Sequence, residues 1–137
     1  MKNAGRWSVP VLTLLLLMSP PLTCATEPGP VTISVHEAEI LIYLLPVAHQ
    51  LRAEGMDVGW ELQDQNRDRY PKDDYYVFWL VNNKRASAGS TTIGYYAVNK
   101  RTGEIWNTDL DQLVSSAELE GVQKILRCAH GRDDSMK

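Results

Sequence analysis

The sequence predicts an α+β fold in which an N-terminal helix packs on an antiparallel sheet of three to four strands, with an additional helix at the C-terminus. Three observations predict it. Apolar residues recur at helical spacing over residues 35–54, alternate with polar residues from residue 56, and return to helical spacing after residue 115. The chain has 137 residues, a length that suits one domain with a modest core.

Residues 1–25 are predicted to be a cleavable secretory signal. Lys2 and Arg6 precede an apolar run that ends near Met18, and small residues follow as far as Ala25. The apolar run is too short for a permanent membrane helix, which needs about 20 apolar residues. We therefore expect the mature chain to begin at Thr26 and to be periplasmic or secreted.

The two cysteines bear on this export signal. Cleavage after Ala25 removes Cys24 and leaves Cys128 as a single cysteine, so the exported domain is expected to be held by its core alone. A second interpretation makes Cys24 the lipid-bearing cysteine of a bacterial lipoprotein, although residues 21–23 depart from the pattern of such signals.

Charge restricts the class of partner. Removal of the basic residues in the signal takes the formal net charge from −3 to −5. An acidic domain is a poor candidate for nucleic-acid binding, which relies on clustered Lys and Arg. No segment after the signal resembles a membrane helix, so we expect a protein partner and leave the oligomeric state open.

The predicted first helix follows a short leader. Residues 26–33 hold two prolines around a glycine and read as flexible, and Ser34 with Glu37 has the spacing of a capping box that begins a helix. Pro46 lies inside the helical pattern and must kink the helix or begin a second short one. Gly55 is the natural stop.

Four strands are predicted next. Residues 56–62 alternate between apolar and polar, and residues 75–81 form an unbroken aromatic and aliphatic run typical of a central strand. Residues 93–98 and 104–106 form a hairpin whose Gly103 can take a positive φ. That turn needs no ligand to explain it, because a phosphate-binding loop would have several glycines and a helix after it.

The last predicted element is a helix that Ser115 and Glu118 open as a second capping box and that Gly131 ends. The chain therefore divides into a signal (1–25), a flexible leader (26–33), a single α+β domain (34–131) and a polar tail (132–137).

Residues suited to catalysis or metal binding do not form a recognisable group. His36, His49 and His130 lack metal-ligand spacing. Residues 64–68 imitate the start of a calcium loop, but Arg69 stands where that loop needs glycine. No nucleophile elbow surrounds any serine. We expect no catalytic residue, no metal, no cofactor and no enzymatic activity.

A resemblance to a known family adds to these patterns. Residues 94–99 and 102–106, GYYAVN and TGEIW, resemble the closing hairpin of small exported PepSY-type and other cystatin-like domains. The helix over 35–54 is similar to the one that such domains place before their sheet, so the resemblance covers residues 34–107. It implies a non-catalytic domain that inhibits or binds other exported proteins, and it carries over no catalytic residue.

Aromatic residues of the predicted strands must divide between the two faces of the sheet. Some should therefore lie on the face away from the first helix, where an exposed aromatic patch often marks a partner surface. The alternative is that the C-terminal helix covers that face and makes it part of the core. The residues concerned are Tyr75, Tyr76, Phe78, Trp79, Tyr95, Tyr96 and Trp106.

These patterns favour a non-catalytic exported protein that binds or inhibits another protein, for instance an immunity-like inhibitor of a toxin or hydrolase. One alternative is an accessory or structural subunit of an envelope assembly. Another is a cystatin-like domain that binds a small ligand or acts as an enzyme, which a deep pocket lined by His49, Trp60 or Tyr95 would favour.

The predicted partner-binding residues lie in the two long loops. Lys84, Arg85 and Ser90 belong to the loop 82–92, which is basic and rich in small residues, and Tyr70 in the loop 64–74 could anchor the partner. The alternative is a solvated linker whose charges only aid solubility.

Overall fold

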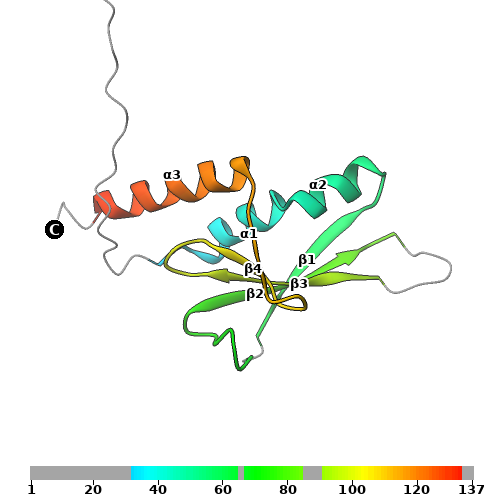
Figure 1. Ribbon diagram of the computed structural model, residues 1–137, viewed down its shortest axis with the longest axis horizontal. Helices are drawn as coiled ribbons and strands as arrows, with labels where there is room; N and C mark the ends of the chain where they lie inside the picture. Colours follow the sequence, from blue (N-terminus) through cyan, green and yellow to red (C-terminus); the bar gives the residue numbers. More distant parts are fainter. Residues whose placement is uncertain (1–31, 65–66, 85–90, 134–137) are drawn as a thin grey trace, which may run out of the picture.

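The computed structural model describes residues 32–64, 67–84 and 91–133, with the side chains described as far as residue 130. Figure 1 shows helices lying over one side of an antiparallel sheet. The strands follow one another in space in the order β1-β2-β3-β4-β5. Their bounds are β1 Val58–Gln63, β2 Tyr75–Asn82, β3 Thr92–Asn99, β4 Ile105–Asn107 and β5 Gln112–Val114, and the helices are α1 Val35–Tyr43, α2 Pro46–Ala53 and α3 Ala117–Asp133.

The predicted sheet of three to four strands is wrong, because the sheet has five strands, and two short helices precede it instead of one. The missed strand, β5, has three residues and pairs with β4 through Ile105↔Val114 and Asn107↔Gln112. Three residues are too few to display an alternating pattern, so the sequence does not reveal this strand and only its pairing with β4 does. The packing of helices on one face of the sheet agrees with the predicted α+β arrangement.

The start of α1 confirms the first capping box. The Ser34 hydroxyl accepts a hydrogen bond from the Glu37 backbone amide, and the Glu37 carboxylate accepts one from the Ser34 amide. Of the two outcomes that the sequence allowed at Pro46, the structure has the second short helix, with Pro46 at its first turn. Proline is favoured there because its missing N–H needs no partner at a helix start.

Three boundaries differ from the prediction. Ile33, the last residue of the predicted flexible leader, is buried in the core, and its backbone amide donates to the Lys100 carbonyl. The cap of α3 is Ser116, whose hydroxyl accepts from the Leu119 amide, so the box predicted at Ser115 is one residue early. The same helix continues through Gly131 to Asp133.

The main core lies between the sheet and the helices. Phe78, Leu80 and Val98 from the sheet pack with Leu41 and Ile42 of α1, and all five side chains are fully buried. Transfer of such side chains from water supplies about 1.5–3 kcal/mol each. The aromatic run of β2 therefore forms an interior strand, paired with β1 on one side and β3 on the other.

The turn between β3 and β4 is packed beneath helices. Gly103 has a φ of 72°, and its carbonyl accepts a 2.8 Å hydrogen bond from the buried Gln123 side chain of α3. Arg127 of α3 donates to the adjacent Thr102 carbonyl over 2.9 Å. The turn thus fastens α3 to the sheet.

Candidate functional site

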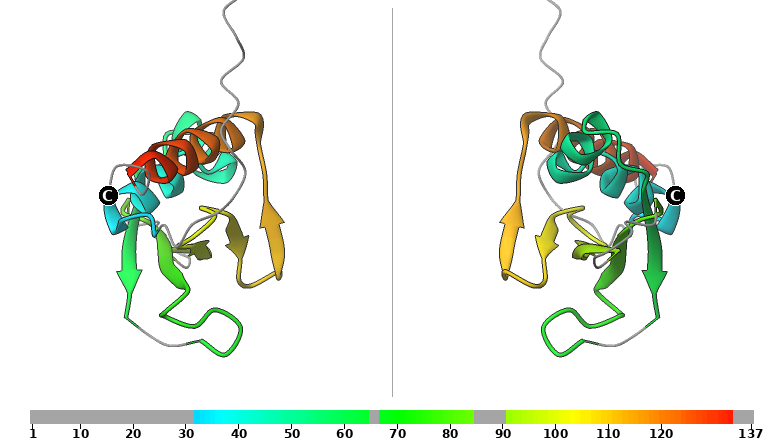
Figure 2. Two further views of the ribbon diagram at one scale, coloured as in Figure 1. Left: turned by 90° about the vertical axis from the view of Figure 1, so that its left-hand side faces the viewer. Right: turned by 90° about the vertical axis from the view of Figure 1, so that its right-hand side faces the viewer.

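The face of the sheet opposite the helices is the first place to look for a site. The views in Figure 2 show the helices together on one side of the sheet, and α3 contacts α1. The sequence left open whether the C-terminal helix covers the aromatic face. In the structure it lies on the other side, so no helix of the described residues covers this face, which is called the open face below.

An aromatic pair occupies the middle of the open face. Trp79 of β2 lies between Glu61 of β1 and Tyr95 of β3 in one cross-strand row. The Trp79 and Tyr95 rings are stacked, with centroids 6.4 Å apart and an interplanar angle of 17°. Both side chains are half-buried, and the Trp79 Nε1–H donates to the Thr92 hydroxyl over 3.2 Å. The pair is a fixed, partly accessible aromatic surface.

The loop 64–74 places a cation over this pair. The Arg67 guanidinium carbon lies 4.2 Å from the centroid of the Tyr95 ring, which is a cation–π contact. Arg67 also donates from Nη1 to the Thr108 hydroxyl over 3.3 Å, and that hydroxyl donates to the Tyr95 carbonyl over 3.3 Å. Arg67, Trp79 and Tyr95 form what we call the Arg67 cluster.

The rest of the loop covers the neighbouring part of the open face. Tyr70 is only 6% exposed and packs with Val77 and Ala97 in a second, smaller core. Its hydroxyl donates to Asp111 Oδ1 over 2.9 Å, and Arg69 pairs with the same carboxylate. Burial raises the pKa of Tyr70, and the Asp111 carboxylate raises it further.

Asp111 holds the loop 64–74 against the turn between β4 and β5. It has a φ of 52°, a left-handed conformation that side chains other than glycine seldom adopt. A cavity of about 330 Å³ lies beside this contact, lined by Arg69, Tyr70, Tyr75, Trp106 and Asp111. The charged groups at its wall already bind each other, so this contact serves to order the loop.

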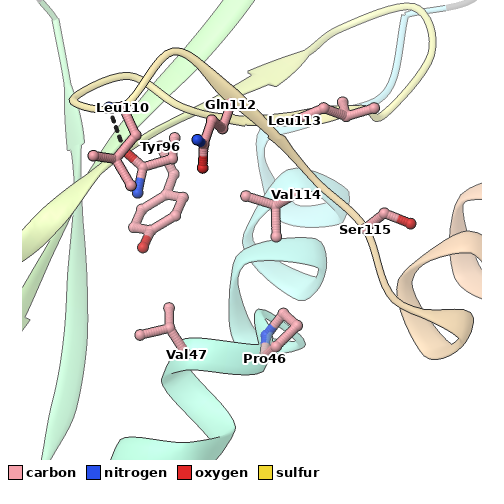
Figure 3. A pocket seen from close by; sticks show the side chains of 9 residues that line it. Pro46, Val47, Tyr96, Leu110, Gln112, Leu113, Val114 and Ser115 are labelled. Carbon is pink, nitrogen blue, oxygen red and sulfur yellow. Dashed lines mark hydrogen bonds between the residues drawn. The ribbon is translucent and has the colours of Figure 1, made fainter.

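A second cavity of about 330 Å³ lies on the helix side, between α2 and the hairpin of β4 and β5. Figure 3 shows Val47 of α2 and Tyr96 of β3 pointing toward one another across it. Burial raises the pKa of Tyr96, and no lining residue is an acid, a histidine or a lysine. The lining residues are Pro46, Val47, Tyr96, Asn107, Leu110, Gln112, Leu113, Val114 and Ser115.

The pocket that would have favoured a small-ligand or enzymatic domain is not formed by the predicted residues. Trp60 pairs with Leu80 and packs on the helix-side core, whereas Tyr95 lies on the open face under Arg67. The two aromatic side chains are therefore on opposite sides of the sheet. His49 is exposed on α2 and contacts Tyr43 edge to face.

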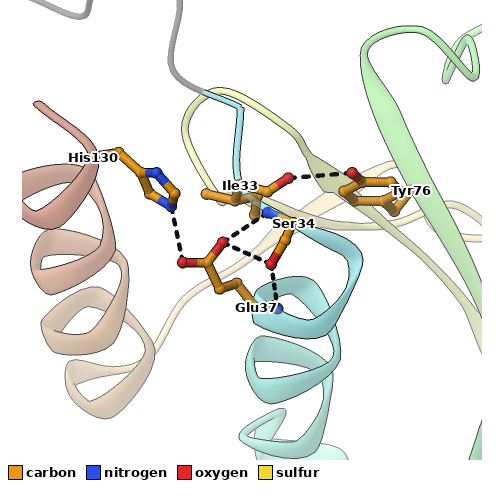
Figure 4. Close-up of polar contacts among 5 residues, drawn as sticks. All are labelled: Ile33, Ser34, Glu37, Tyr76 and His130. Atoms are coloured by element: carbon orange, nitrogen blue, oxygen red, sulfur yellow. Dashed lines mark hydrogen bonds and ion pairs between the residues drawn. The ribbon is translucent and has the colours of Figure 1, made fainter. Parts of the chain in front are cut away.

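A polar cluster joins the start of α1 to α3, as Figure 4 shows. Glu37 Oε1 lies 2.8 Å from His130 Nε2, and Glu37 Oε2 accepts from the Ser34 amide and hydroxyl. Partial burial raises the pKa of Glu37, but the hydrogen bonds from Ser34 and His130 outweigh it, so the pKa lies below its usual value. Both carboxylate oxygens are occupied by structural contacts.

Cys128 is disulfide-bonded. The prediction of a single cysteine applies to the chain after cleavage at Ala25, whereas this disulfide is formed in the full 137-residue chain. The other cysteine of the sequence, Cys24, lies outside the described residues. Within residues 32–64, 67–84 and 91–133, no group of three or more His, Cys, Asp and Glu side chains could hold a metal ion, and no helix is long and apolar enough to cross a membrane.

The predicted partner-binding residues are not brought together. Lys84 donates from Nζ to the Gly55 carbonyl over 2.5 Å, at the turn between α2 and β1. Tyr70 packs on Val77 near the other end of β2, an eight-residue strand, so roughly 20 Å separates the two. Because Tyr70 is buried, its side chain stabilises the loop and is not exposed as an anchor. Arg85 and Ser90 lie outside the described residues.

The Arg67 cluster was only partly visible in the sequence. Strand alternation places Trp79 on the face opposite Phe78, but the register that sets Tyr95 beside Trp79 comes from the structure. Arg67 gives no such signal, because it lies in a charged loop and its contact with Thr108 spans 41 residues.

The fold of the chain is similar to that of a solved structure. No family model matches the chain, and no curated protein does. A chain in the structure of a type VI secretion system effector–immunity complex from Pseudomonas protegens superposes with a TM-score of 0.57. The two sequences are 19% identical over 78% of this chain and 87% of that chain. The chain therefore shares its fold with a component of an effector–immunity complex.

Proposed function

We propose that this protein is an immunity-like inhibitor that binds an exported toxic protein through the open face of its sheet. The observation that carries the proposal is the Arg67 cluster, a stacked Trp–Tyr pair under an arginine on a face without helices. Trp, Tyr and Arg are the residues most enriched among binding hot spots. The shared fold with a component of an effector–immunity complex supports the same role.

The rigidity of the cluster supports binding. Each ring is fixed, Trp79 by its hydrogen bond to Thr92 and Tyr95 by its position between Trp79 and Arg67. Side chains that are ordered before association lose little conformational entropy when a partner docks, so more of the contact energy appears as affinity.

The proposed compartment is the periplasm or the cell exterior, as the signal in residues 1–25 predicts. The intact mass of the exported protein tests the signal. A chain beginning at Thr26 supports the predicted cleavage site, and an added diacylglycerol at Cys24 supports the lipoprotein alternative. Because the sequence has only two cysteines, a disulfide within one chain at Cys128 requires that Cys24 be retained, and the same mass reveals this.

The function is tested with the product of the neighbouring open reading frame as the candidate toxin. We expect co-expression to rescue growth and the two proteins to co-purify in stoichiometric amounts. Trp79→Ala should abolish rescue without unfolding the protein. Ile125→Ala is the matched control, because Ile125 is a large apolar side chain exposed on α3, on the helix side.

Two results would reject the proposal. One is rescue that survives Trp79→Ala, which would show that the open face does not bind the toxin. The other is failure of the wild-type protein to bind or neutralise any toxic protein encoded beside it.

A further inference from the structure

We infer that Arg67 receives a carboxylate from an acidic segment of the partner, so that the open face selects an Asp or Glu next to an apolar residue. This inference rests on the proposed function and specifies its recognition chemistry. It follows from the position of the guanidinium, the pairing of the neighbouring cations and the aromatic surface beside it.

The position of the guanidinium comes first. The Tyr95 ring supports it on one side at 4.2 Å, and the Thr108 hydroxyl takes one of its donors. A guanidinium has five N–H donors in a planar fork that matches a carboxylate. The other four donors make no hydrogen bond to the described residues, and the ring and the hydroxyl already fix the orientation of the fork.

The pairing of the other cations in the same loop is the second observation. Arg69 pairs with Asp111, and Lys72 pairs with Asp64 at 2.5 Å. Arg67 forms no ion pair within the described part of the chain. Two cations of the loop are thus paired with acids, whereas the one that lies on the aromatic pair has no acidic partner among the described residues.

Glu61, an acid in the strand row of the aromatic pair, does not change this. Glu61 lies in the same row as Trp79 and Tyr95, but Trp79 separates it from Tyr95. Strands lie about 4.8 Å apart, so Glu61 is roughly 10 Å from the Tyr95 position across the sheet. At about 0.1 M salt that separation is roughly one Debye length, so an exposed acid there interacts only weakly with the guanidinium.

The aromatic pair supplies the apolar half of the site. Trp79 is half-buried beside Tyr95, so an apolar side chain adjacent to the bound carboxylate would cover its ring. Covering the ring excludes water from the carboxylate–guanidinium contact and strengthens it. A lysine at position 67 would keep the charge but lose the planar fork and its stacking on Tyr95.

The first experiment uses model peptides and needs no natural partner. The wild-type protein is titrated at low salt with a capped Glu-Leu-Glu-Leu-Glu-Leu peptide, and with the same peptide carrying Gln in place of Glu. We expect saturable NMR shifts of the Trp79 indole N–H and the Arg67 Nε–H with the acidic peptide alone. Arg67→Gln should weaken binding about tenfold, and Arg67→Lys should restore only part of it.

Arg101→Gln is the matched control, because it changes the charge equally at an exposed residue of the turn between β3 and β4. The inference is overturned if the acidic peptide gives no saturable shift at Trp79, or if Arg101→Gln weakens binding as much as Arg67→Gln. The second result would mean that the peptide senses only the overall charge.

The second experiment separates this inference from the proposed function. With a toxin that the wild-type protein neutralises, Arg67→Gln should lower affinity about 30-fold, and Arg101→Gln should leave it unchanged. A toxin bound equally well by Arg67→Gln refutes the carboxylate site and leaves the immunity role standing. Peptide binding that needs Arg67, without neutralisation of any toxin, refutes the immunity role and leaves the carboxylate site standing.

Discussion

Replacing Gly103 with alanine tests how the turn between β3 and β4 is packed. Its φ of 72° is a left-handed conformation, which costs a residue with a Cβ about 1–2 kcal/mol. The added Cβ would lie 3.2 Å from Leu41 Cδ1. Leu41 is fully buried in the main core, so its side chain would have to shift within a packed core. That shift would cost about 1–3 kcal/mol more. We expect a total loss of about 2–5 kcal/mol in the free energy of unfolding.

Gly55→Ala is the control that isolates the packing contribution. Gly55 also has a positive φ, 85°, but nothing lies within 4 Å of its added Cβ. It should therefore lose only the conformational share, about 1–2 kcal/mol. Urea unfolding gives both values from the midpoints at constant slope, and each kcal/mol should lower the Tm by about 4–8 °C. Equal losses in the two variants would refute the tight contact between Gly103 and Leu41.

Further substitutions test the core, a buried hydrogen bond and the acid response. Phe78→Ala should lower the free energy of unfolding by about 3–5 kcal/mol because Phe78 is fully buried. Trp79→Ala should lower it less because Trp79 is half-buried. If neither substitution changed the unfolding curve, the assignment of β2 would be wrong. Gln123→Leu leaves the buried Gly103 carbonyl without its donor and should cost about 1–3 kcal/mol by urea unfolding, whereas wild-type stability would mean that another group satisfies the carbonyl. Partial burial raises the pKa of Glu37, but its hydrogen bonds outweigh this, so the pKa is lower in the folded state than in the unfolded chain. Glu37 therefore stabilises the fold above about pH 4.5, and this stabilisation is lost as the pH falls through the folded pKa. Glu37→Gln should flatten the loss of Tm between about pH 6 and pH 3, and an unchanged acid dependence would contradict this.

Local chemistry explains the elements that the sequence predicted well. The cap at Ser34 and Glu37 needs residues three apart on one turn, and it forms as expected. The start of α2 at Pro46 follows from a missing backbone N–H. The positive φ at Gly103 follows from the needs of a tight hairpin. Each feature depends on neighbours within a few residues, so the sequence carries the information directly.

Elements that depend on pairing were predicted less well. The strand β5 exists through its register with β4, and three residues show no period of their own. The same limit applies to Ile33, which was assigned to a flexible leader although it packs beneath α1 and accepts a hydrogen bond from the Tyr76 hydroxyl. In both cases contact with another segment decides the structure, β4 for β5 and Tyr76 for Ile33.

The candidate site divides in the same way. The sequence by itself determined that Trp79 and Phe78 point to opposite faces of the sheet, because side chains alternate along a strand, whereas the register that sets Trp79 opposite Tyr95 came from the structure. Only the tertiary structure decided that α3 lies on the other side of the sheet, that Tyr70 is buried, and that Arg67 lies on Tyr95. The physical reason is that side-chain direction along a strand is fixed by the local backbone, whereas the path of a loop is fixed by contacts such as Arg67 with Thr108, which join residues far apart in the chain.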